Sequence, residues 1–139
     1  MNIEILKQFS VFMPNKPGAL SRLTKLFAEK EINILGIASE VRDDSGLVRI
    51  AVGAGVEVSQ LLSQAGFSSV ETRLLSVDVD DRPGELLRVA DALASAKVNI
   101  TTVYGTSMVG QRSRILIAAE HTDKAIKILD QLKQESVPA

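Results

Sequence analysis

The sequence has no cysteine and no tryptophan, one histidine, one tyrosine, and only 4% aromatic residues. Without cysteine there is no disulfide framework and no thiolate to bind a metal or attack a substrate. His121 is the single histidine and is accompanied by neither cysteines nor a carboxylate cluster, so neither a metal site nor a histidine base is predicted. A net charge of −1 with so few aromatic residues also argues against nucleic-acid binding, because an RNA-binding sheet displays basic and aromatic side chains together.

Long apolar segments are lacking as well. The longest runs, such as residues 115–119, fall far short of the roughly 20 residues that a membrane span needs. Residues 1–10 show no basic stretch followed by a long apolar core, which a signal peptide would have. We therefore expect a soluble, cytoplasmic protein with no membrane partner.

What the sequence does contain is an internal repeat. Residues 15–20 read Asn-Lys-Pro-Gly-Ala-Leu, and residues 81–86, 66 positions later, read Asp-Arg-Pro-Gly-Glu-Leu. Each copy is followed at the same distance by Asn-Ile, at residues 33–34 and 99–100. The apolar positions between these motifs repeat at the same spacing. The chain is therefore a duplication, and we place the two units at residues 1–66 and 67–139.

Each copy predicts the order strand, helix, strand, strand, helix. In the first copy we expect the second strand at 33–42, a hairpin turn at 43–46, a third strand at 47–52 and a short helix at 56–65. In the second copy the hairpin is expected around 109–111 and the last helix begins after Thr122 as N-cap.

The repeated loop stands between a strand and a helix. Pro17 suits the first helical position, where its fixed φ is favourable and its missing N–H costs nothing. Asn15 and Asp81 are able to close an Asx turn just before the helix.

A ferredoxin-like unit needs one more strand than this order supplies. Residues 68–79 form one long run that can end the first unit and begin the second. Our hypothesis is that residues 1–6 provide the strand that the second unit lacks. The predicted fold class is α+β: two ferredoxin-like βαββαβ units with antiparallel sheets, helices on one face, and strands shared between units.

The two loops and their Asn-Ile pairs resemble those of the ACT domain, a small regulatory βαββαβ module that binds amino acids in many metabolic enzymes. The resemblance covers nearly the whole chain as a tandem pair with no catalytic domain attached. In that family the loop after the first strand and the start of the second strand line the effector site, usually at an interface between two modules. The ligand-binding residues that the resemblance implies are Asn15, Lys16, Pro17, Gly18, Ala19, Leu20, Asn33, Ile34, Asp81, Arg82, Pro83, Gly84, Glu85, Leu86, Asn99 and Ile100.

The chemistry of these residues suits a free amino acid. The first turn of the helix after each loop leaves backbone N–H groups at the positive end of the helix dipole, which favours a carboxylate. Gly18 and Gly84 remove a Cβ that would block close approach. Asn33 and Asn99 offer an amide oxygen to an ammonium group. Asp81, where the first copy has Asn15, adds a charge-assisted hydrogen bond, so the second site is expected to be the one filled if only one is.

Simpler interpretations stay open for several residues. A Pro-Gly turn often does no more than begin a helix, and each Asn either binds the ligand or caps the preceding helix. Arg112 and Arg114 most simply form a solvated edge beside the hairpin. Asp78, Asp80, Asp81 and Asp91 offer carboxylates, yet no partner of tunable pKa lies at an obvious spacing, so no enzymatic activity is predicted.

The predicted function is that of a non-catalytic regulatory protein that binds a small amino acid or related metabolite, without cofactor or metal. The alternative is a regulatory subunit that acts by docking on a metabolic enzyme, without a ligand of its own. The expected partners are an amino acid effector, a metabolic enzyme, and a second copy of the chain in a homodimer.

Overall fold

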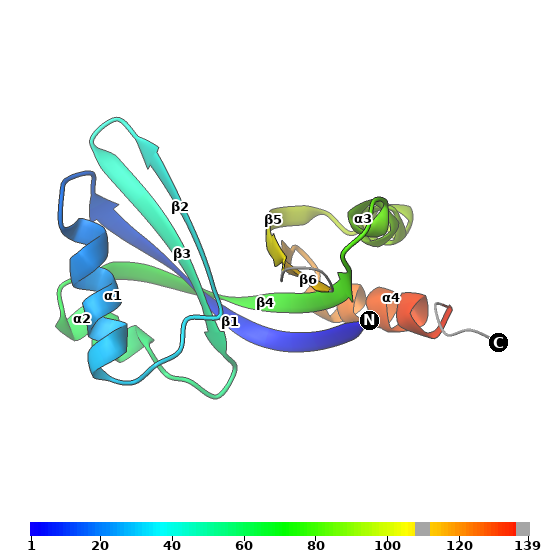
Figure 1. Ribbon diagram of the computed structural model, residues 1–139, viewed down its shortest axis with the longest axis horizontal. Coiled ribbons are helices and arrows are strands. Elements are labelled where there is room, and N and C mark those ends of the chain that lie inside the picture. Colours follow the sequence, from blue (N-terminus) through cyan, green and yellow to red (C-terminus); the bar gives the residue numbers. More distant parts are fainter. Residues whose placement is uncertain (108–111, 136–139) are drawn as a thin grey trace. The chain divides into compact units, whose positions relative to one another are not determined.

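The computed structural model describes residues 1–107 and 112–135, which form six strands and four helices (Figure 1). The hairpin expected around residues 109–111 lies outside the described residues. The elements are β1 (Asn2–Pro14), α1 (Ala19–Glu29), β2 (Gly36–Arg42), β3 (Ser45–Gly53), α2 (Ser59–Gln64), β4 (Ser68–Asp80), α3 (Glu85–Ser95), β5 (Ile100–Ser107), β6 (Arg112–Ala119) and α4 (Thr122–Glu135).

The strand order is β2-β3-β1 in the first copy and β4-β6-β5 in the second, and the neighbouring strands within each copy pair antiparallel. In the first copy β3 pairs with both β1 and β2, and in the second copy β6 pairs with both β4 and β5. The predicted α+β class with two ferredoxin-like units is confirmed. Each unit places its own two helices on the same face of its strands (Figure 1).

Contacts divide the chain into an N-terminal unit, residues 6–72, and a C-terminal unit, residues 1–5 together with 73–139. The long strands β1 and β4 therefore each contribute to both units. Met1 and Ile3 pack against the core of the C-terminal unit. The boundary that the sequence predicts between residues 66 and 67 stays a prediction.

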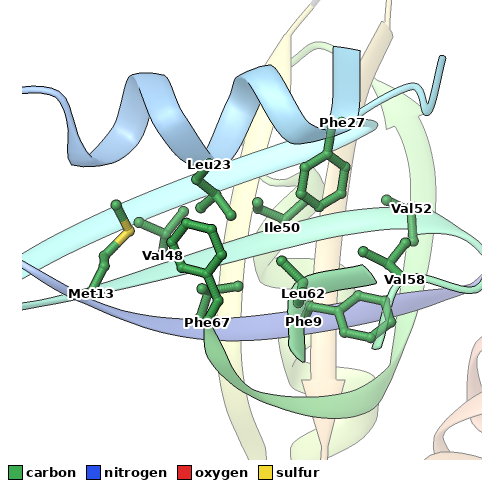
Figure 2. Packing of buried hydrophobic residues seen from close by; sticks show 11 residues of the cluster. Phe9, Met13, Leu23, Phe27, Val48, Ile50, Val52, Val58, Leu62 and Phe67 are labelled. Carbon is green, nitrogen blue, oxygen red and sulfur yellow. The ribbon is translucent and has the colours of Figure 1, made fainter. Parts of the chain in front are cut away.

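The core of the N-terminal unit lies between its strands and α1 and α2 (Figure 2). Alternate residues of β1 point into it, so Phe9 and Val11 are fully buried while Phe12 on the other face is exposed. α1 presents Leu23 and Phe27, one helical turn apart, to the same core. The buried members of this core are Phe9, Val11, Met13, Leu23, Phe27, Val48, Ile50, Val52, Val58, Leu62 and Phe67.

The core of the C-terminal unit has the same design at equivalent positions. α3 packs against α4, and α4 packs against β6. The buried members are Leu75, Val77, Val79, Val89, Leu93, Val98, Ile115, Ile117, Ala125 and Leu129.

The helices α1 and α3 end in the same way, with a residue in the left-handed conformation. Glu31 has φ 54° after α1, and the next residue, Ile32, donates its N–H to the Phe27 carbonyl at 2.9 Å. Lys97, with φ 60°, holds the equivalent place after α3. This is the Schellman arrangement, which satisfies the last helical carbonyls without a side-chain cap.

The Schellman ending explains a boundary that the sequence places wrongly. The second strand was expected from residue 33, yet β2 begins at Gly36. Residues 30–35 connect α1 to the sheet, and the Leu35 N–H donates to the Ala51 carbonyl at 2.8 Å. Among the described residues, no helix is both long and apolar enough to cross a membrane.

The packing of Ile3 generates a stability prediction. Ile3→Ala should lower the free energy of unfolding by about 1–3 kcal/mol, because the side chain contacts the core of the C-terminal unit. Ile5→Ala is the matched control: Ile5 is 41% exposed, so its loss should cost under about 0.5 kcal/mol. Denaturant titration measures both, and amide exchange should show the loss of protection in β5 and β6. Equal effects of the two substitutions would contradict the assignment of residues 1–5 to the C-terminal unit.

Candidate ligand-binding site

The repeated loop takes the same backbone path in both units. Gly18 and Gly84 stand directly before α1 and α3 with φ of 87° and 93°, in the left-handed region. The first helical hydrogen bonds run to these glycines, from Arg22 N–H to the Gly18 carbonyl at 2.9 Å and from Arg88 N–H to the Gly84 carbonyl at 3.0 Å. The prediction that Pro17 is the first helical residue is wrong, because the left-handed residue after it postpones the helix to Ala19.

The glycines are required by their backbone conformation and not by crowding. A Cβ placed on Gly18 or Gly84 would meet no atom within 4 Å. Their φ near 90°, well beyond the 54° and 60° of Glu31 and Lys97, is instead a conformation that strains any residue with a side chain. Glycine therefore fixes the angle at which each helix leaves the loop.

The first residue of each loop connects it to the neighbouring strands. Asn15 donates its backbone N–H to the Asp44 carbonyl at 3.0 Å and its Nδ2 to the Asp43 carbonyl at 3.3 Å. In the C-terminal unit the Ser113 hydroxyl donates to Asp81 Oδ1 at 2.9 Å. These side chains bond across to the β2–β3 turn and to β6, so the predicted Asx turn is not formed.

In the N-terminal unit the loop borders a small pocket of about 90 Å³. The pocket lies between the loop, the start of α1 and the strands β2 and β3, and its lining is mostly apolar. The lining residues are Met13, Pro14, Asn15, Lys16, Ala19, Leu20, Ser39, Val41, Gly46 and Val48.

The C-terminal unit has a pocket at the equivalent place, with a volume of about 340 Å³ and a far more charged lining. Most of its residues correspond to those of the first pocket through the 66-residue repeat, with an offset of 65 in the last strand. They are Val79, Asp80, Asp81, Arg82, Glu85, Leu86, Gly105, Thr106, Ser113, Arg114 and Ile115. The duplication therefore repeats a pocket as well as a sequence motif.

Glu85 is the unusual member of the second pocket, because it is ionisable yet only 7% exposed. Its Oε1 accepts from Arg82 Nε at 2.7 Å, and its Oε2 accepts from Arg88 Nη2 at 3.0 Å. The hydrogen bond from Arg82 is the main cause that holds the pKa of Glu85 below its usual value, with Arg88 adding to it against the opposing effect of burial. The same pair raises the pKa of Arg82.

Arg112 and Arg114, for which the sequence suggested a solvated edge, are partly exposed and have carboxylate partners. Arg112 Nη1 lies 2.9 Å from Asp80 Oδ1, and Arg114 Nε lies 3.6 Å from Asp78 Oδ1. Arg82 Nη2 also lies 3.8 Å from Asp80 Oδ2. The loop of the C-terminal unit is thus held in a network of alternating charges.

The Asn-Ile pairs lie away from the loops of their own units. Asn33 follows the C-terminal end of α1, whereas the loop precedes its N-terminal end, and an 11-residue helix is about 16 Å long. Asn33 is exposed, and Ile34 packs against the core. Within one unit the loop and the Asn-Ile pair therefore do not form one site, and the role of Asn33 and Ile34 in binding stays a prediction.

Asn99 and Ile100 show the same separation in the C-terminal unit. The Asn99 side chain donates from Nδ2 to Glu120 Oε1 at 3.2 Å, and Ile100 begins β5 and packs against the core. Because the Schellman bonds already close both helices, neither Asn33 nor Asn99 serves as a helix cap.

Sequence reasoning missed the pocket residues that come from the hairpins, such as Ser39, Val48, Thr106 and Ser113. The alternation of β2 and β3, continued from the hairpin turn, would have placed them beside the end of β1. Within the described residues, no group of three His, Cys, Asp or Glu side chains is arranged to hold a metal ion.

Comparison with known proteins agrees with this architecture. A family model described as an ACT domain pair matches residues 4–137. The chain belongs to the ACT domain pair family. The resemblance carried by the two loops is thereby confirmed.

Solved structures show the same fold. A protein from Bacteroides thetaiotaomicron superposes with a TM-score of 0.85 at 26% identity, covering 96% of this chain and 92% of that one. The ligand-free regulatory subunit of aspartate kinase from Thermus thermophilus gives 0.67 at 17% identity, covering 94% and 95%. The corresponding subunit from Thermus flavus gives 0.61 at 17%, covering 94% of each. No curated protein matches the chain.

The left-handed glycines generate the next prediction. Gly84→Ala should destabilise the protein by about 1–2 kcal/mol, because alanine is strained at a φ of 93°. Gly55→Ala is the control: a Cβ there also meets nothing within 4 Å, but Gly55 has no left-handed φ. It should be neutral or slightly stabilising. Thermal and denaturant unfolding measure both, and equal stabilities would contradict a conformational role for Gly84.

The ion pairs of Glu85 predict a pH dependence of stability. The folded pKa lies below the unfolded value of about 4.3, so the unfolded state binds the proton more readily. The contribution of Glu85 is therefore fully present above that pH and lost as the pH falls through the folded pKa. Glu85→Gln should cost about 1–2 kcal/mol at pH 7 and flatten the decline of stability below pH 4.5. Denaturant midpoints between pH 7 and 3 measure this, and parallel curves for the two proteins would contradict it.

Proposed function

We propose that this ACT domain pair is a non-catalytic regulatory protein that binds a small amino acid or a related metabolite at its loop pockets. The observation that carries the proposal is the recurrence of one pocket design in both units. In each, a left-handed glycine begins a helix beside a pocket, and the loop is bonded to the adjacent strands.

The groups at the pockets fit a zwitterionic ligand. The first helical turn presents backbone N–H groups at the positive end of its dipole, which favours a carboxylate. Lys16 or Arg82 stands beside that turn, and Asn15 or Asp81 offers oxygen to an ammonium group. The apolar lining from strand residues such as Val48 and Ile115 suits a short side chain.

A non-catalytic role fits the same pockets. His121 does not line either loop pocket. Two of the three carboxylates of the second pocket, Asp80 and Glu85, are paired with arginines, and Asp81 accepts from the Ser113 hydroxyl, so they are poorly suited to general acid–base work. The aspartate kinase regulatory subunits with the same fold make an amino acid pathway the natural setting for the proposed regulation.

A second candidate, docking on a metabolic enzyme or on a second copy, is favoured by exposed apolar side chains. Phe12, Ile37 and Val41 of β1 and β2 are 53%, 44% and 53% exposed. Ile37 and Val41 lie on the same face of the edge strand β2, whereas the strand register places Phe12 on the opposite face of the sheet. Exposed apolar side chains that share one face of an edge strand often mark a contact with another protein. β2 and β5 also end the strand order, so each offers an edge for pairing in a homodimer.

A thermal-shift screen of the twenty standard amino acids tests the proposed function. A ligand at about 100 times its Kd should stabilise the folded state by about 2.7 kcal/mol, which raises the melting temperature measurably. Propionate and ethylamine at the same concentration control for general salt effects. If none of the twenty amino acids shifts the melting temperature at millimolar concentration, the proposed binding of an amino acid is contradicted. Co-purification of an enzyme with the chain would then favour docking.

A further inference from the structure

The two loop pockets share one backbone design but differ in charge at a single structural position. Ala19 is the first residue of α1 and Glu85 is the first residue of α3, and they correspond through the 66-residue repeat. Each lines its own pocket. The side chain at this position therefore decides what stands at the positive end of the helix.

In the C-terminal unit that position already holds a carboxylate. Glu85 is the acidic residue of the first turn of α3, and its two oxygens accept from Arg82 at 2.7 Å and from Arg88 at 3.0 Å. The side chain is 8% exposed, so the ion pairs are shielded from solvent on the carboxylate side. The positive charge of Arg82, which would attract a ligand's carboxylate, is thus already paired with the carboxylate of Glu85.

A second carboxylate would meet repulsion in this pocket. Asp80 and Asp81 line it together with Glu85, against Arg82 and Arg114 as the cations of the lining. Two carboxylates that share one site disfavour each other's ionised form. The ligand would have to displace Glu85 from Arg82, and a buried carboxylate without its partner is costly.

In the N-terminal unit the same position is empty of charge. The first turn of α1 has no acidic residue. Lys16, which corresponds to Arg82, is the charged member of the pocket lining, and it forms no ion pair within residues 1–107 and 112–135. Arg22, which corresponds to Arg88, is turned away: its Nη2 donates to the Ala65 carbonyl at 2.6 Å, and its guanidinium lies 4.4 Å from the centre of the Phe67 ring.

We propose that the N-terminal unit holds the carboxylate-binding site of this protein, and that Glu85 occupies the equivalent site of the C-terminal unit as a built-in substitute for the ligand's carboxylate. This inference rests on the proposed function. It reverses the preference for the second site that Asp81 suggested from sequence.

The first pocket is the smaller and less charged of the two. Its volume is about 90 Å³, against about 340 Å³ for the second, and its lining includes Leu20, Val41 and Val48, which suit a short side chain. Asn15 donates from Nδ2 to Asp43, which leaves Oδ1 to accept from an ammonium group. The ligand class is therefore an α-amino acid with a short, uncharged side chain, such as L-alanine.

Exchange of the two residues tests the inference. We would titrate ¹⁵N-labelled protein with L-alanine and follow the backbone amides of Leu20 and Ser21 in one loop and of Leu86 and Leu87 in the other. In the wild-type protein the first pair should shift and the second should not. Ala19→Glu should weaken binding at the first loop by about tenfold or more through like-charge repulsion, and Glu85→Ala should give the second loop a response of its own.

Neutral variants separate charge from size and guard against misfolding. Ala19 packs partly against the core, so Ala19→Gln carries the same steric cost as Ala19→Glu without its charge. Glu85→Gln keeps the shape of Glu85 while it removes the charge. Ala19→Glu should bind about tenfold or more weakly than Ala19→Gln, and Glu85→Gln should allow a response at the second loop. The amide spectrum of each variant reports directly whether it folds.

The possible outcomes distinguish this inference from the proposed function. A response at the second loop of the wild-type protein equal to or stronger than that at the first overturns the inference and leaves the proposed function standing. Equal affinity of Ala19→Glu and Ala19→Gln also overturns it. If neither loop responds to L-alanine or to any other standard amino acid in any variant, the proposed function fails and the inference fails with it.

Discussion

The left-handed conformation of one glycine in each repeat is the constraint on which the loop pockets depend. Gly18 and Gly84 turn the chain sharply between strand and helix, and the helix then begins at the very next residue. The first helical side chain is thereby placed in the lining of the pocket, beside the exposed N–H groups of the first turn. Because a Cβ at either glycine would meet nothing, it is the backbone angle alone that demands glycine here.

Duplication has kept this backbone and changed its electrostatics. The loop of the N-terminal unit has Lys16 as its charged side chain and bonds to the β2–β3 turn through an amide. In the C-terminal unit the equivalent region is a network in which Asp80 and Glu85 pair with Arg112, Arg82 and Arg88. Such a network stabilises the loop without a ligand, since each charge already has its partner. In our proposal the N-terminal unit binds the carboxylate of an external ligand, whereas in the C-terminal unit the carboxylate of Glu85 occupies the equivalent place.

The fold was predictable where local pattern decides it, and less so at the element ends. The repeat, the alternation of β1 and the apolar stripe of α1 specify strand, helix and buried face. The helix start predicted at Pro17 is too early. The fixed φ of proline is compatible with a helix, but it does not indicate that the next residue, Gly18, is left-handed. The predicted start of β2 is three residues too early, because Glu31 takes a left-handed conformation that lengthens the connection after α1. A glycine at that position would have indicated such a helix end, whereas a glutamate does not.

By itself, the sequence determined the duplication, the order of elements and the two loops that identify an ACT pair. These follow from short-range periodicity and turn chemistry, which act within a few residues. Only the tertiary structure decided which distant side chains meet. It grouped residues 1–5 with the C-terminal unit, separated Asn33 from its loop by the length of α1, and brought Ser113 to Asp81. It also showed that Glu85 is buried and paired, which its place three residues after Arg82 allows but does not require. The reason is that burial and strand register depend on how whole elements pack together, and the sequence of a single segment does not determine that packing.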